Sequence, residues 1–124
     1  PIHIAYVDFS KAYDTVDYSY LHKTLHQSGF STDFVRLIEI LNTGNTCKVV
    51  TPWGLTESYS IERGVRQGCP LSPLLFSLFI EPCLRWLDCG KGFKIRLGQT
   101  RARTNVLAFA DDIALTGRSH PDLE

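Results

Sequence analysis

The sequence contains no methionine, and it has no apolar run long enough to cross a membrane. Its most apolar stretch, residues 71–87, is interrupted by two prolines and by charged Glu81 and Arg85, which excludes a spanning helix of about 20 residues. No signal peptide is visible. Because translation normally starts at methionine, and because residues 119–124 resemble the start of another element, we expect a fragment of a longer protein.

The sequence also has no net charge and few cysteines. The 13 basic and 13 acidic residues cancel, and four cysteines (Cys47, Cys69, Cys83 and Cys89) show neither zinc-site nor disulfide-framework spacing, so reduced thiols in an intracellular protein are expected. Residues 82–103 are an exception, with six basic residues and one acid. This local excess suits nucleic-acid phosphates, and a solvated basic hairpin accounts for it nearly as well.

The composition is that of one folded domain of 124 residues, and hydrophobic periodicity predicts strands and helices in mixed order. Residues 2–7 are apolar on both faces, which is typical of a central strand, and Asp8 follows at its C-terminal end. The other expected elements are a helix from Asp17 to about Ser28, a helix from Ser31 to Leu41, strands over 46–51 and 55–61 around a turn at 52–54, an all-round apolar helix starting at Ser72 and kinked or ended by Pro82, and a strand over 93–97 before a basic turn.

Asp111 and Asp112 lie between two short apolar runs, at 106–110 and 113–115. If these runs are strands joined at Ala110 and Asp111, they form a tight hairpin with carboxylates at its tip. Adjacent like charges beside buried strands are unfavourable, and a divalent cation would offset that cost. For one acidic pair alone, an ordinary acidic turn is the simpler interpretation.

Asp8 supplies a third carboxylate. If residues 2–7 and the hairpin are neighbours in one sheet, the three carboxylates converge at one edge of that sheet. Such hard oxygen ligands suit Mg²⁺ or Mn²⁺, and two ions about 3.5–4 Å apart support in-line phosphoryl transfer. Because adjacent residues on a straight strand point to opposite faces, we rank Asp8 and Asp111 first as ligands and Asp112 second.

Three blocks of the sequence follow one another along the chain: DFSKAYD at 8–14, RGVRQGCPLSPLLF at 63–76 and FADD at 109–112. Together they resemble motifs A, B and C of the reverse transcriptase palm, most closely those of non-LTR (LINE-like) retrotransposon enzymes. The resemblance implies an α+β fold, with an RNA-recognition-like (ferredoxin-like) antiparallel sheet packed on helices and an acidic β-hairpin. Residues 1–124 would form a partial palm domain without fingers and thumb.

The resemblance also implies the catalytic residues. Asp8, Asp111 and Asp112 would form the acidic cluster of the active site. Two Mg²⁺ ions, with Mn²⁺ as the alternative metal, would be held by Asp8, Asp111 and the backbone carbonyl of Phe9.

Further matched residues imply contacts with substrates. Tyr13 would exclude a 2′-hydroxyl on the incoming sugar, and Gln67, Gly68 and Ala110 would lie at the nascent base pair and the primer end. Arg63 and Arg66 would reach nucleic-acid phosphates, although a surface role explains them about as well.

The implied activity is RNA-directed DNA polymerisation, in which a nucleotidyl group passes from a dNTP to a primer 3′-hydroxyl. Expected partners are an RNA template, a DNA primer, a dNTP and the rest of a polyprotein with an endonuclease; no membrane is expected. Without fingers and thumb, we expect the isolated chain to be inactive. In a eukaryote, the family implies synthesis in the cytoplasm and action in the nucleus.

Two alternatives remain open from the sequence. One is a catalytically degenerate palm-derived domain that binds nucleic acid, although intact Asp8, Asp111 and Asp112 argue against it. The other is a group II intron or retron type of reverse transcriptase, which Phe109 in place of tyrosine and the composition of residues 63–76 disfavour.

Overall fold

The computed structural model describes residues 2–88 and 93–123. The chain divides into two compact units: a helical unit, Tyr13–Phe79, and a sheet unit, Pro1–Ala12 with Ile80–Glu124. Within the described residues, no helix has the length and apolar character needed to cross a membrane. The unit boundary falls within helix α3 (Ser72–Leu87).

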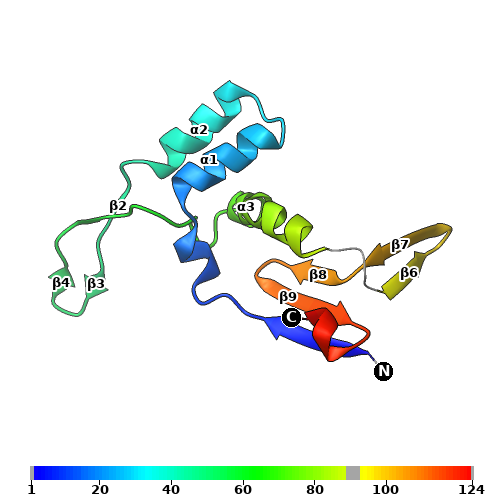
Figure 1. Ribbon diagram of the computed structural model, residues 1–124. Coiled ribbons are helices and arrows are strands. Elements are labelled where there is room, and N and C mark those ends of the chain that lie inside the picture. Colours follow the sequence, from blue (N-terminus) through cyan, green and yellow to red (C-terminus); the bar gives the residue numbers. More distant parts are fainter. Residues whose placement is uncertain (1, 89–92, 124) are drawn as a thin grey trace. The chain divides into compact units, whose positions relative to one another are not determined.

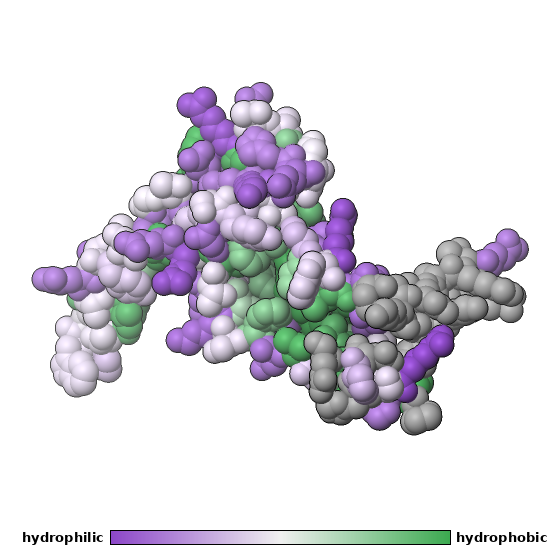
Figure 2. Space-filling view, viewed as in Figure 1, coloured by the Kyte–Doolittle hydropathy of each residue, from purple (hydrophilic) through white to green (hydrophobic). Residues whose placement is uncertain are grey.

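The helical unit is built around two packed helices, α1 (Tyr18–Gln27) and α2 (Thr32–Asn42) (Figure 1). Both caps agree with the sequence, because Asp17 accepts a hydrogen bond from the N–H of Tyr20 (2.8 Å) and Ser31 accepts one from Phe34 (3.3 Å). The face of this pair seen in Figure 2 is mostly hydrophilic, although Leu37 and Ile40 of α2 are exposed apolar side chains. Its buried apolar side chains are Leu21, Leu25, Val35 and Ile38. The two predicted helices are therefore confirmed.

The cap of α1 predicts a pH dependence of stability. The hydroxyl of Ser19 and the N–H of Tyr20 hold the pKa of Asp17 below its ordinary value of 3.8. A carboxyl group whose pKa is lower in the folded than in the unfolded state stabilises the fold at pH values above the unfolded-state pKa. This contribution disappears as the pH falls through the folded-state pKa. We expect Asp17→Asn to lower the melting temperature at pH 7 relative to wild type, and the difference to shrink at pH 3. A constant difference would contradict this account of the cap.

Residues 46–61 form a projecting arm of four short strands. β2 (Thr46–Cys47) pairs with β5 (Tyr59–Ser60), and β3 (Val50–Thr51) pairs with β4 (Gly54–Leu55), both antiparallel. The prediction of two continuous strands is wrong. Between the ladders, the N–H of Thr56 donates to the carbonyl of Val49 (3.0 Å), but the N–H of Val49 donates to the side-chain hydroxyl of Thr56 (2.9 Å) and not to a backbone carbonyl.

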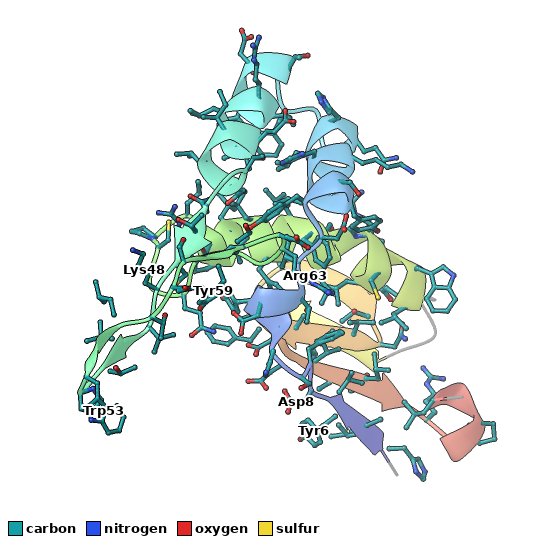
Figure 3. All side chains as sticks on the ribbon, turned by 90° about the vertical axis from the view of Figure 1, so that its left-hand side faces the viewer. Tyr6, Asp8, Lys48, Trp53, Tyr59 and Arg63 are labelled. Atoms are coloured by element: carbon teal, nitrogen blue, oxygen red, sulfur yellow. The ribbon has the colours of Figure 1, made fainter. Side chains whose placement is uncertain are left out.

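The tip of this arm is a tight turn. Because Thr51 pairs with Gly54, the turn consists of Pro52 and Trp53, and Gly54 belongs to β4. Trp53 stands at the far end of the hairpin (Figure 3) and is 94% exposed. The pairing register of a strand is specified mainly by the burial of one of its faces. The strands of this arm have no buried face, which explains why their paired segments are short.

Helix α3 continues through Pro82, so of the two expectations for this proline, a kink or an end of the helix, the end is wrong. Its buried positions Ser72, Leu75, Phe76 and Ile80 recur at helical spacing on one face. Trp86 is 82% exposed and Leu74 is also exposed, so α3 is not buried all round as its composition predicted.

The sheet unit contains a three-stranded antiparallel sheet in the order β1-β9-β8 (Figure 1). Its strands are β1 (His3–Val7), β8 (Val106–Phe109) and β9 (Asp112–Gly117). In the part of the chain described, β1 pairs with β9 alone and is an edge strand, so its prediction as a central strand is wrong. Tyr6, 82% exposed, shows that one apolar face of β1 is uncovered, which the sequence pattern cannot reveal.

Residues 93–104, within the segment rich in basic residues, form a separate hairpin of the sheet unit. The predicted strand over 93–97 is confirmed as β6 (Phe93–Leu97), but the expected basic turn contains a further strand, β7 (Thr100–Thr104), paired with β6. Gly98, with a φ of 61°, permits the short connection between them. The side chains of Lys91, Lys94, Arg96, Arg101 and Arg103 lie outside those that the structure describes.

Candidate functional site

The three predicted catalytic carboxylates belong to the sheet unit. Phe109 pairs with Asp112, so Ala110 and Asp111 form the turn between β8 and β9. Ala110 has a φ of 54°, an uncommon value for a residue with a side chain, and a positive φ at the first turn position suits tight hairpins. This turn places Asp111 at the hairpin tip.

The register of the sheet relates Asp8 to Asp112. The pairing of β1 with β9 ends at Val7 and Ile113, and the same register continued by one residue would set Asp8 opposite Asp112. Opposed residues of antiparallel strands point to the same face, with Cα atoms about 4.5–5.5 Å apart. By this continuation Asp112, which the sequence ranked second, would share a face with Asp8, and Asp111 lies in the adjoining turn.

These side chains suit a hard cation in their chemistry. Asp8 and Asp112 are exposed and Asp111 is half-buried, as is Phe9, whose carbonyl is a predicted ligand. Among the side chains that the structure describes, no three of His, Cys, Asp or Glu are arranged to hold a metal ion. Like-charged carboxylates repel one another, so closer approach requires a compensating positive charge. An all-oxygen donor set of this kind fits Mg²⁺ or Mn²⁺.

The helical unit brings the predicted nucleotide-contacting residues Tyr13, Gln67 and Gly68 together. They line a cavity of about 520 Å³ with Cys69, Pro70, Ser72 and Pro73. The ring of Tyr13 stacks on Phe76, with centroids 5.1 Å apart and planes 16° apart. The fourth predicted residue, Ala110, belongs to the sheet unit.

Backbone hydrogen bonds join the loop that contains Gly64 and Val65 to the segment that carries Tyr13. The N–H of Gly64 donates to the carbonyl of Val16 and the N–H of Val65 to that of Tyr13, each at 2.8 Å. Tyr18 adds a bond from its hydroxyl to the Gly64 carbonyl (2.9 Å). Gly64 has a φ of 95°, and a Cβ placed there would lie 2.9 Å from the Cα of Asp14. Only glycine fits this contact without displacement.

Asp14 is a site residue that sequence reasoning left without a role. Its Oδ1 accepts a hydrogen bond from Nε2 of Gln67 (3.3 Å), which links the two matched blocks through their side chains. The only signal in the sequence was its position as the last residue of the block at 8–14.

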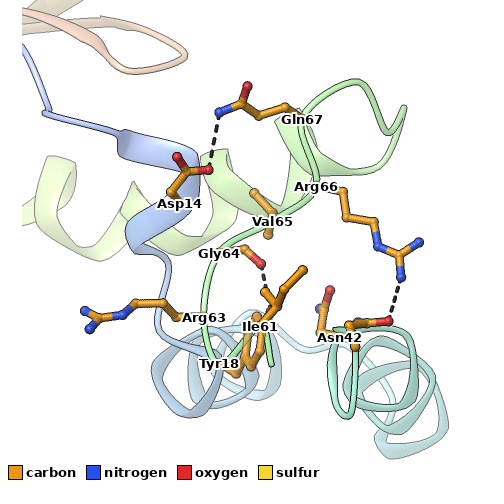
Figure 4. A pocket seen from close by; sticks show the side chains of 10 residues that line it. Asp14, Tyr18, Asn42, Ile61, Arg63, Gly64, Val65, Arg66 and Gln67 are labelled. Carbon is orange, nitrogen blue, oxygen red and sulfur yellow. Dashed lines mark hydrogen bonds between the residues drawn. The ribbon is translucent and has the colours of Figure 1, made fainter. Parts of the chain in front are cut away.

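A second cavity, of about 260 Å³, contains the predicted nucleic-acid-binding residues Arg63 and Arg66 (Figure 4). The two arginine side chains lie on opposite sides of the connecting segment in this view. Nη2 of Arg66 donates to Oδ1 of Asn45 (2.6 Å). Asn42 and Asn45, which also line the cavity, appeared in the sequence only as the end of a helix.

Two pKa values are shifted near these cavities. Backbone hydrogen bonding from Leu71, followed by contacts with Ser72 and the charge of Arg66, lowers the pKa of the Cys69 thiol. Burial raises the pKa of Tyr18, whose hydroxyl donates to the carbonyl of Gly64.

Comparison with known proteins matches residues 2–124 to the family described as reverse transcriptase (RNA-dependent DNA polymerase). The chain is 39% identical over 118 residues to the transposon TX1 uncharacterized 149 kDa protein of Xenopus laevis, covering 95% of this chain and 9% of that protein. It is 34% identical over 122 residues to the retrovirus-related Pol polyprotein from type-2 retrotransposable element R2DM of Drosophila melanogaster, covering 98% and 11%. A type-1 R2 polyprotein of Popillia japonica is 36% identical over 110 residues, covering 88% and 15%.

Proposed function

This chain belongs to the reverse transcriptase (RNA-dependent DNA polymerase) family, and on that premise we propose that it is the catalytic palm of an RNA-directed DNA polymerase. The relatives reported above are two Pol polyproteins of R2 retrotransposable elements and one protein of the transposon TX1, and the predicted resemblance to non-LTR enzymes is confirmed. The chain spans 9–15% of these relatives. We propose that the remainder of a polyprotein, including an endonuclease, accompanies it.

The observation that carries this proposal is the placement of Asp8, Asp111 and Asp112 at one end of one sheet. In the proposed reaction, the 3′-hydroxyl of a DNA primer attacks the α-phosphorus of a dNTP paired to an RNA template, and pyrophosphate leaves. Asp8, Asp111 and the carbonyl of Phe9 would hold Mg²⁺, or Mn²⁺, with Asp112 completing the cluster. When bound, such ions supply activation of the attacking oxygen and stabilisation of the leaving oxygen.

The finer architecture is part of the proposal. We propose that β1, β9 and β8 belong to an RNA-recognition-like (ferredoxin-like) sheet, and that the β8–β9 hairpin is the acidic hairpin of the palm. Its support is the antiparallel order β1-β9-β8 and the two carboxylates at the β8–β9 connection. Action on chromosomal DNA in the nucleus, after synthesis in the cytoplasm, follows as a proposal for a eukaryotic host.

The cavity around Tyr13, Gln67 and Gly68 would receive the incoming nucleotide, with Ala110 beside the primer end. Tyr13 is supported from behind by Phe76, since the two rings stack at 5.1 Å. A ring held in this way cannot move aside easily, so it would exclude a 2′-hydroxyl by steric contact.

This role of Tyr13 predicts a change in sugar selectivity. In a chain extended by the flanking regions that its relatives carry, we expect wild type to extend a primer on an RNA template with dNTPs. Tyr13→Val should raise incorporation of ribonucleotides relative to deoxynucleotides by about 10- to 100-fold, because it removes the excluding ring. The measurement is kcat/KM for each nucleotide at fixed Mg²⁺.

A matched control replaces another aromatic residue of the helical unit, Tyr59, which lies on the arm and does not line the nucleotide cavity. Tyr59→Val should leave the selectivity ratio unchanged. Wild type that binds primer–template yet never extends it would instead favour the degenerate binding domain.

A further inference from the structure

The cavity between the C-terminal end of α2 and residues 61–67 has an unexplained feature in its wall (Figure 4). Asn42 is 8% exposed, and its side-chain Nδ2 is buried without a hydrogen-bond acceptor. Buried polar groups in native proteins are nearly always paired, and an unpaired donor destabilises the fold. Such an unpaired donor calls for an explanation, and a ligand in the cavity that Asn42 lines would supply the missing acceptor.

A cation lies beside this donor. Arg66 is exposed, and the hydrogen bond from its Nη2 to Oδ1 of Asn45 (2.6 Å) orients the guanidinium plane. Asn45 is itself anchored, because its Nδ2 donates to the carbonyl of Leu41 (2.8 Å). A guanidinium carries five N–H donors, so this bond leaves others for an incoming oxygen.

The acidic residue of this cavity is already engaged. Asp14 accepts a hydrogen bond from Gln67 (3.3 Å), at the end of the cavity away from Asn42 and Arg66 in Figure 4. Asp14 is the one acidic residue that lines this cavity, so no second carboxylate of the lining neutralises the amide donor of Asn42 and the guanidinium of Arg66 at the other end. That end therefore favours an anionic acceptor over a cation.

We propose that this cavity binds a phosphate group, with Arg66 and Asn42 as donors. The choice of phosphate over another anion rests on the proposed function, because templates, primers and nucleotides all carry it. The group has two sources, a phosphodiester of a nucleic-acid strand or a free polyphosphate. The volume of about 260 Å³ admits one such group with its hydration.

The test is a ¹⁵N NMR titration of the 124-residue chain, which reads the side-chain amide of Asn42 directly. One arm adds single-stranded RNA of about eight nucleotides, and the other adds sodium pyrophosphate. We expect the Asn42 amide resonances to shift in a saturable manner with RNA. A response to pyrophosphate alone also supports the site and assigns it to a free polyphosphate.

Three variants sharpen the measurement. Arg66→Gln should weaken binding about tenfold or more by removing a charge-assisted hydrogen bond, and should lower the salt dependence of log Kd by about one. Asn42→Leu, whose binding is followed through the backbone N–H of Arg66 because the side-chain amide is gone, should weaken binding about fivefold. It should at the same time raise the melting temperature, because it removes the unpaired buried donor. Arg36→Gln is the matched control, since Arg36 is an exposed arginine of α2 outside the cavity, and its Kd should stay within about twofold of wild type.

Three results would overturn the site: Asn42 resonances that stay fixed in both arms, equal weakening by Arg66→Gln and Arg36→Gln, or an Asn42→Leu protein that binds as wild type. Circular dichroism establishes that each variant is folded. The polymerase proposal and the phosphate site can fail independently. If the chain with its flanking regions is inactive but its Asn42 amide still responds to phosphate, only the polymerase proposal fails. An active enzyme whose Asn42 amide never responds lacks it.

Discussion

Replacing Asp111 by asparagine is expected to reduce RNA-templated primer extension by about 10³-fold or more, in a chain that includes the flanking regions of its relatives. Asparagine keeps the shape of the side chain but removes its negative charge. A site that must hold divalent cations between carboxylates loses several kcal/mol of transition-state stabilisation with each charge, about 1.4 kcal/mol for every tenfold in rate. The measurement is single-turnover extension at fixed Mg²⁺.

Two companion variants make this result interpretable. Asp33→Asn removes the same charge from the first turn of α2, in the unit that does not carry the carboxylate cluster, and should change the rate by less than about twofold. Asp112→Asn compares the two arguments about ligands, since strand alternation ranks Asp112 second whereas the register continued by one residue would set it opposite Asp8. Equal activity of wild type and Asp111→Asn would mean that the metal site lies elsewhere.

Gly64→Ala is expected to destabilise the fold by about 2–4 kcal/mol, through two effects that add. The φ of 95° is unfavourable for any residue with a Cβ, and that Cβ would meet the Asp14 backbone at 2.9 Å. Relief of the clash requires the loop to move away from Tyr13 and Val16, which breaks the two 2.8 Å backbone bonds. Urea unfolding of the 124-residue chain, followed by circular dichroism, measures the loss.

Gly29→Ala separates the two effects. Gly29 has a similar φ of 86°, but nothing lies within 4 Å of a Cβ built there. Its substitution should therefore cost only the conformational part, about 1 kcal/mol. If Gly29→Ala and Gly64→Ala destabilise equally, the close approach of Gly64 to Asp14 makes no contribution to stability.

The features that followed from sequence are those with local physical causes. The caps at Asp17 and Ser31 depend on a side chain and an N–H three residues later, so the starts of α1 and α2 could be predicted. The strand β6 was likewise predicted in full. The acidic pair and the matched blocks at 8–14, 63–76 and 109–112 established the family, because side-chain chemistry in order along the chain is visible without a fold.

The sequence by itself determined which residues carry the proposed chemistry, whereas the tertiary structure decided which of them meet. An apolar pattern on both faces cannot distinguish the edge strand β1 from a central strand, since strand order depends on pairing partners distant in the chain. The contact of Gly64 with Asp14, the bond from Gln67 to Asp14 and the unpaired amide of Asn42 are equally non-local. Only the folded backbone, by bringing distant segments to within a few ångströms, assigns these residues a role.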